Sequence, residues 1–134
     1  MIEQADAVET VLRRILRSGS LEAFPTHSTD LDVVLAVAAV TLMRRRPYNE
    51  QEINAALVDW LESVQGWMDH VTLRRRMVDL GFLKRTVNGS RYFMNYGRVV
   101  EVLGDPAVEL DAGAIAREVL REREERKRMY TSGD

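Results

Sequence analysis

The most informative part of this sequence is residues 69–94, which read DHVTLRRRMVDLGFLKRTVNGSRYFM. Its first half has the pattern of a short helix. Asp69 is a residue type that commonly caps a helix N-terminus, and Gly81 is the type that commonly ends one. We therefore predict a helix over about Val71–Leu80. Its predicted inward face consists of Leu73, Met77 and Leu80.

Two β-prone segments follow this helix directly. They are Phe82–Val87 and Ser90–Met94, and the Asn88-Gly89 pair between them is a strong signal for a tight hairpin turn. Two helices joined by a turn and followed by a hairpin are typical of a winged helix–turn–helix. The fold class that we predict is therefore mainly α with one β-hairpin, a winged helix with additional N- and C-terminal helices.

Three segments upstream have the apolar spacing of helices. The second is apolar on nearly all sides, which is typical of a helix buried in the centre of a domain. Trp60 and Trp67 have the spacing of core residues. The predicted helices are residues 4–17, residues 31–43 and a helix that begins after Asn49.

Residue types near the helix ends agree with these boundaries. Thr29 with Asp32, and Asn49 with Glu52, have the spacing of capping boxes, in which two residues satisfy each other's backbone N–H groups. Gly66 is predicted to be the left-handed residue that ends the third helix.

The sequence after Gly97 is less decisive. Val99–Leu103 either completes the wing or packs on the body. Asp111 is predicted to cap a last helix, in which every residue from 121 to 128 is charged, as on a solvated helix surface. We expect a single domain over residues 1–134. Its parts are an N-terminal helix and loop (1–28), a winged-helix core (29–98) and a C-terminal extension and helix (99–134).

The charges are distributed unevenly. The net charge is −2, yet residues 71–98 carry seven Lys or Arg and a single acid, Asp79. This basic island favours a polyanionic partner, and intramolecular ion pairs with the acidic helices are the alternative. Arg44–Arg46 form a second basic cluster at the end of the preceding helix, and the alternative is that they stabilise that helix end through its dipole.

Residues 47–94 also contain two groups of residues with a recognisable arrangement. The first group is Tyr48, Glu50, Glu52, Ile53, Asn54 and Leu57. The second is Asp69, Leu73, Arg74, Arg75, Met77, Val78, Asp79, Gly81, Leu83, Arg85, Gly89 and Tyr92. This pattern resembles a bacterial domain family of unknown function, which occurs alone or attached to transcriptional regulators of the arsenic-repressor type. The resemblance implies a winged-helix-like fold and a role in transcription.

The second helix of a helix–turn–helix lies in the major groove of DNA. On a helical wheel Arg75 points away from the core, so it is the first candidate for a base or phosphate contact. Thr72 and Arg76 flank it. In the hairpin, Lys84 and Arg91 should share one face, and basic hairpin tips commonly follow the phosphate backbone; ordinary solvated strand residues are the alternative. The candidate nucleic-acid-binding residues are Thr72, Arg75, Arg76, Lys84, Arg85, Asn88 and Arg91.

Two charged residues beside these candidates have different expected roles. Arg74 lies at the border of the apolar arc, so we expect a structural role in which its stem packs and its guanidinium pairs with an acid. Asp79 either holds a neighbouring arginine in position or argues against insertion into a DNA groove. The acids available to Arg74 are Glu50, Glu52 and Asp69, the last two being possible binding residues themselves.

The sequence offers little chemistry for catalysis. It has no cysteine, its two histidines lack metal-ligand spacing, and it has no glycine-rich phosphate loop. We therefore predict neither an enzyme nor a bound cofactor or metal. No apolar run is long enough to span a membrane. A cytoplasmic location is expected.

The predicted function is a DNA-binding transcriptional regulator whose partner is duplex DNA. The apolar stripes of the terminal helices, 4–17 and 111–129, exceed what a minimal winged helix needs, so a homodimer through these helices is expected; the alternative is that both helices cover the core of a monomer. Two alternatives remain open. One is a protein–protein interaction module on the same scaffold, and the other is RNA binding through the same basic helix and wing.

Overall fold

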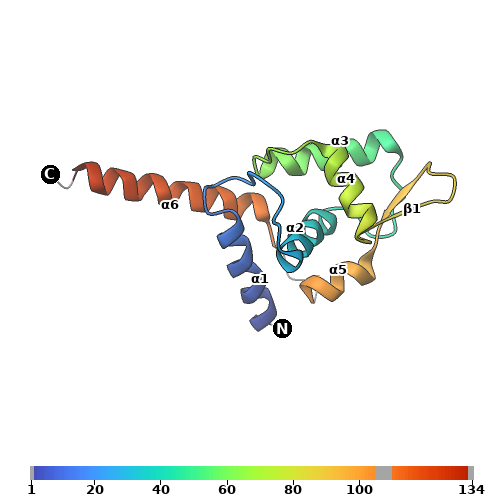
Figure 1. The fold of residues 1–134 in the computed structure, drawn as a ribbon, viewed down its shortest axis with the longest axis horizontal. Coiled ribbons are helices and arrows are strands. Elements are labelled where there is room, and N and C mark those ends of the chain that lie inside the picture. Colours follow the sequence, from blue (N-terminus) through green and yellow to red (C-terminus); the bar gives the residue numbers. More distant parts are fainter. Residues whose placement is uncertain (1, 105–109, 133–134) are drawn as a thin grey trace.

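The computed structural model describes residues 2–104 and 110–132 of the chain (Figure 1). The described residues form a mainly helical molecule with one two-stranded antiparallel hairpin, as predicted for the fold class. The elements are α1 (Ile2–Ile15), α2 (Ser28–Val40), α3 (Glu50–Ser63), α4 (His70–Asp79), β1 (Leu83–Arg85), β2 (Tyr92–Met94), α5 (Tyr96–Leu103) and α6 (Ala112–Ser132).

Helix α2 is the centre of the core. Its residues from Val33 to Ala39 are all buried, and α1, α4 and α5 pack around it. The capping box predicted at Thr29 is wrong, because α2 begins at Ser28 after His27, which makes no side-chain cap hydrogen bond. Thr29 already lies inside the first turn and so cannot cap it. Burial of this helix on all sides stabilises it without a cap.

The ends of α3 are formed by local hydrogen bonds. Asn49 accepts a bond from the Glu52 N–H and the Glu52 carboxylate accepts one from the Asn49 N–H, which confirms this capping box. Gly66 is not the left-handed residue, because Gln65 has that conformation at φ 48°. The glycine is needed for a close approach, since a Cβ there would lie 2.6 Å from Leu61 Cδ2.

The turn between α3 and α4 leaves Trp67 outside the core. Trp60 is 7% exposed, as predicted, but Trp67 is 72% exposed. The helical spacing that links the two tryptophans ends at Ser63, where α3 stops. The backbone of Trp67 is held by its N–H, which donates to the carbonyl of Leu21 at 3.0 Å.

Helix α4 begins and ends near the predicted residues. The Asp69 carboxylate accepts a hydrogen bond from the Thr72 N–H, and Gly81 has the left-handed φ of 85° that closes the helix. Leu73 and Met77 are fully buried. Leu80, however, is 38% exposed, because it lies beyond the last helical residue and no longer follows the helical wheel.

The hairpin has the predicted register but a different turn. Arg85 lies opposite Tyr92, as a turn at Asn88-Gly89 requires. The N–H of Gly89 bonds to the carbonyl of Thr86, so the chain reverses over four residues and not in a two-residue loop. Tyr48 pairs with Tyr92 in an isolated antiparallel bridge, which joins the segment before α3 to the edge of the hairpin.

Helix α5 packs against α2 and buries Val99 and Leu103, so this segment packs on the body. The apolar stripes of α1 and α6 are also buried within this chain, by packing of α1 on α2 and α6, and of α6 on α3. The Asp111 cap of α6 is confirmed by a bond from the Ala114 N–H.

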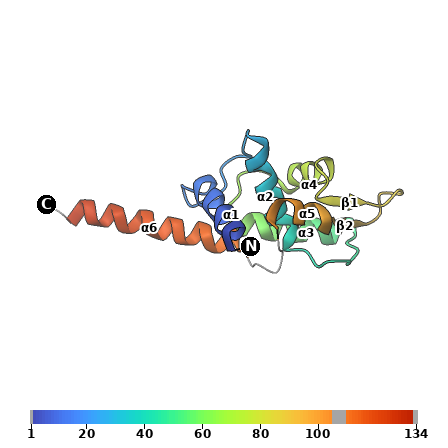
Figure 2. The ribbon, with the colours of Figure 1, turned by 90° about the horizontal axis from the view of Figure 1, so that it is seen from below.

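The distal part of α6 projects from the body at the end opposite to the hairpin, as the two views in Figures 1 and 2 show. In the described part of the chain, no helix is both long and apolar enough to cross a membrane.

Candidate nucleic-acid interface

The side chains of α4 and the hairpin meet at a groove of about 200 Å³. Two of the predicted candidates, Arg75 from α4 and Arg85 from β1, line this groove. Asp79 lines the same groove. The sequence separation of these residues is small, but only the packing of β1 on α4 brings them to one place. The polar and aromatic part of the lining consists of Arg74, Arg75, Asp79, Arg85 and Tyr92.

Arg75 is the most available cation of the groove. It is exposed on the outer side of α4, as the helical wheel predicts. Within the described ranges, no acceptor forms a hydrogen bond or ion pair with its guanidinium. Its neighbour Arg76 is exposed as well, but its guanidinium lies 4.8 Å from the ring centre of Phe24. Arg75 can therefore contact a ligand without first breaking an internal interaction.

Arg74 has the structural role that the sequence predicts. Its guanidinium donates a hydrogen bond to Asn54 Oδ1 and pairs with the Glu50 carboxylate at 3.5 Å. It also lies 5.6 Å from the ring centre of Tyr92, and its side chain is only 17% exposed. These contacts link α3, α4 and β2. Arg74 therefore forms the floor of the groove and fixes the helix against the hairpin.

Thr72 and Asp69 are occupied with each other at the start of α4. Besides the backbone bond, the Thr72 hydroxyl donates to Asp69 Oδ2 at 3.1 Å. The pKa of Asp69 is lowered, first because its carboxylate accepts the Thr72 N–H and then because it accepts the Thr72 hydroxyl. Thr72 thus completes a cap, and its hydroxyl proton is not available to a ligand in this arrangement.

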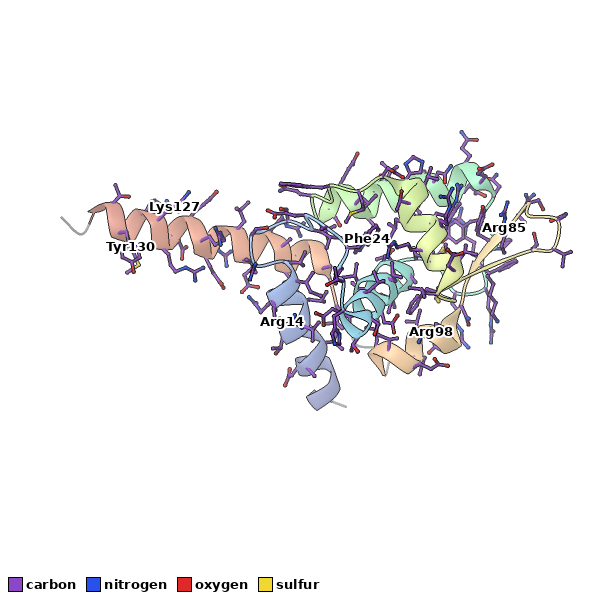
Figure 3. All side chains as sticks on the ribbon, in the orientation of Figure 1. Arg14, Phe24, Arg85, Arg98, Lys127 and Tyr130 are labelled. Carbon is purple, nitrogen blue, oxygen red and sulfur yellow. The ribbon has the colours of Figure 1, made fainter. Side chains whose placement is uncertain are left out.

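The hairpin presents its cations on two faces. Lys84 and Arg91 share one face, as expected. Lys84 lies opposite Phe93, and Arg91 is two residues before Phe93, on the same side of the strand. Arg85 lies on the other face, over the ring of Tyr92 at 5.5 Å, and Figure 3 shows it at the base of the hairpin loop. The hairpin therefore directs Arg85 toward α4.

Asn88 organises the hairpin loop. Its Oδ1 accepts hydrogen bonds from the Thr86 hydroxyl and from both the N–H and the hydroxyl of Ser90. Arg91 Nη1 donates to the carbonyl of Ser90 at 2.9 Å. Asn88 is therefore a structural residue of the loop in this conformation.

Arg98 belongs to the basic island by sequence but is held inside the structure. Its guanidinium lies 4.5 Å from the ring centre of Phe82, donates to the carbonyl of Leu80 at 3.0 Å and pairs with Asp32 at 3.3 Å (Figure 3). Its pair with Glu101 at 3.3 Å is local, but Asp32, Phe82 and the carbonyl of Leu80 come from distant segments, and no local pattern in the sequence indicates those contacts. The intramolecular ion pairs that we considered as an alternative are thus present for Arg74 and Arg98.

The cluster Arg44–Arg46 does not take the alternative role of stabilising the end of α2. The helix already ends at Val40, and the guanidinium groups of Arg44 and Arg46 lie over tyrosine rings. The Arg44 guanidinium lies 3.6 Å from the ring centre of Tyr96, and that of Arg46 lies 4.3 Å from Tyr48. Arg46 also pairs with Glu52 at 2.9 Å. Glu52 is therefore part of a cap and an ion pair and lies outside the groove.

The pKa of the Glu52 carboxyl is lowered, first by the Asn49 N–H and then by Arg46. No group of three or more His, Asp or Glu side chains that could hold a metal ion is present in residues 2–104 and 110–132. Of the predicted site residues, the groove brings together Arg74, Arg75 and Arg85.

Comparison with protein families identifies the class of this chain. Residues 20–94 match the family described as "uncharacterized protein conserved in bacteria", DUF2087. This match covers more than half of the chain and includes α2, α3, α4 and the whole hairpin. The chain therefore belongs to this bacterial family, in agreement with the resemblance found in the sequence. No curated protein and no solved structure matches the chain.

Proposed function

We propose that residues 29–98 form a winged helix and that the chain is a DNA-binding transcriptional regulator. The supporting architecture is the order helix α2, β-bridge at Tyr48, helices α3 and α4, and hairpin β1–β2. In this assignment α4 is the recognition helix, which enters the major groove, and the hairpin is the wing, which follows the phosphate backbone.

The observation that carries this proposal is that Arg75 from α4 and Arg85 from the hairpin line one groove. Arginine is the side chain best suited to bidentate bonds with guanine or with phosphate. Arg75 has no competing internal partner among the described residues, and Arg85 is held in place by the ring of Tyr92. Together they offer two donors at the junction where a major-groove helix and a wing meet one strand of DNA.

The proposal is tested by fluorescence anisotropy with random duplex and single-stranded oligonucleotides over a series of salt concentrations. We expect duplex affinity to fall steeply with salt, with a slope of about −0.9 per phosphate contacted on a log–log plot. Arg75→Ala should weaken binding about 5- to 150-fold, since a good arginine contact contributes ~1–3 kcal/mol.

A matched control is Arg17→Ala, which removes another exposed arginine, one outside the groove. This variant should bind duplex like the natural chain. Equal losses in the two variants, or an affinity that is flat with salt, would overturn the proposal. Preference for the single strand or for RNA would favour the RNA-binding alternative.

A further inference from the structure

Among the described residues, Asp79 is the one acid in a groove lining whose other charged residues are the arginines Arg74, Arg75 and Arg85. It is exposed at the last position of α4 and lines the groove with Arg75 and Arg85. In the described part of the molecule, no cation nitrogen lies within 4 Å of its carboxylate oxygens and no donor bonds to it. It neither neutralises an arginine nor holds one in position.

Asp79 also opposes the local stability of its helix. The C-terminal end of a helix carries partial negative charge, so a carboxylate in the last turn is unfavourable there. Arg75 lies four residues earlier, but this order of base before acid is the weaker one for a helical ion pair. A residue that breaks a local rule without a compensating contact is typical of a functional position.

A carboxylate can accept hydrogen bonds only, and a phosphate repels it. The groups on DNA that suit it are the exocyclic amines on the major-groove edges of the bases. Cytosine presents its N4 amine without an adjacent acceptor, whereas the N6 amine of adenine lies beside the acceptor N7. Cytosine is therefore the base edge that a carboxylate at this position fits best.

We propose that Asp79 is a specificity-determining residue that accepts a hydrogen bond from a cytosine amine, while Arg75 donates to a guanine nearby. This inference rests on the proposed DNA-binding function. Four residues of helix rise about 6 Å, and one base step rises about 3.4 Å. The two side chains should therefore select a guanine and a cytosine that are one or two base pairs apart.

The test is selection of bound sequences from a library of short random duplexes, carried out with the full chain and with Asp79→Asn. The full chain should enrich a cytosine at one position by about 5- to 150-fold over the other bases. An asparagine bonds adenine through N6 and N7, so Asp79→Asn should change the preferred base at that position from cytosine to adenine. The neighbouring guanine should persist in both selections.

Asp59→Asn is the matched control, because Asp59 is an exposed aspartate on α3 outside the groove. It removes the same charge and should leave the selected sequence unchanged. If Asp79→Asn and the full chain select the same bases, this inference is wrong while DNA binding stands. If the full chain retains duplex but enriches no base at any position, the inference is wrong while DNA binding stands; if it retains no duplex at all, both the inference and the proposed function are wrong.

Discussion

Adjacent arginines of α4 perform different tasks, and substitution of each should separate stability from binding. Arg74 bonds Asn54 and Glu50 in a half-buried position, so Arg74→Ala should lower the free energy of unfolding by about 1–3 kcal/mol, the range for hydrogen bonds to charged groups. Arg75→Ala should change it by less than about 0.5 kcal/mol, as is usual for an exposed residue. Urea denaturation of both variants measures this difference, and equal losses would contradict it.

The Asp69 cap should make stability depend on acid. Its pKa is lowered from an ordinary value of 3.8 in the folded protein, so its contribution is complete above that value. The contribution is lost as the pH falls through the lower pKa of the folded state. Asp69→Asn keeps a good N-cap but cannot titrate.

We therefore expect the two proteins to have similar free energies of unfolding at neutral pH. As the pH falls below about 4, the natural chain should lose more stability than the variant, as measured by urea denaturation at each pH. If the free energies of unfolding of the two proteins change in parallel with pH, the hydrogen bonds from Thr72 do not stabilise the charged form of Asp69. Glu52 and Asp30, whose pKa values are also lowered, should give both proteins a common slope.

Residue roles were predictable from the sequence where the partners are local. Asn49 and Asp69 meet backbone groups three residues away, so residue type and spacing identify them. Arg74 follows from its position on a short helix. Arg98 was not predictable, because Asp32 and the carbonyl of Leu80 reach it only after α2, α4 and α5 have packed together.

At the scale of elements, the sequence predicted the helices with clear stripes and missed α5. That segment contains Val99, Val100 and Val102, and β-branched residues favour strands. The side chain of Asn95 does not cap the helix, since it donates to the carbonyl of Gly81. Packing on the buried α2 stabilises α5, and such packing cannot be read from local sequence.

The hairpin loop should control the position of Arg85. Gly89 has a left-handed φ of 71°, and a Cβ there would lie 2.9 Å from Arg85 Nη2. Gly89→Ala should therefore lower the free energy of unfolding by about 1–2 kcal/mol and weaken duplex binding, because the arginine must move. Val87→Ala is the control, since Val87 is fully exposed in the same loop. Urea denaturation and anisotropy check both effects, and a Gly89→Ala variant with unchanged affinity would separate Arg85 from binding.

At the scale of the whole molecule, the structure changes which surface we expect to form the predicted dimer. The apolar stripes of α1 and α6 are buried within one chain, so they give no reason for a second copy. The distal part of α6 projects from the body. Its residues 121–125 include three acids and two arginines, and residues 126–128 are all basic, so two antiparallel copies would place segments of opposite net charge side by side. Tyr130 is 86% exposed near the end of this arm.

We therefore expect a homodimer formed by the arms, with the two α4–hairpin surfaces at its outer ends. A chain that stops after Leu120 loses the arm but keeps the 2.8 Å pair between Arg13 and Glu118. It should unfold at nearly the same temperature, because exposed ion pairs such as that of Glu122 contribute little.

Sedimentation equilibrium should show a dimer for the full chain, weakened by salt, and a monomer for the shortened one. The shortened chain should still bind a short duplex, since α4 and the hairpin lie at the end of the molecule opposite to the arm (Figure 1). A full chain that stays monomeric at every concentration would contradict the dimer without affecting DNA binding by the groove.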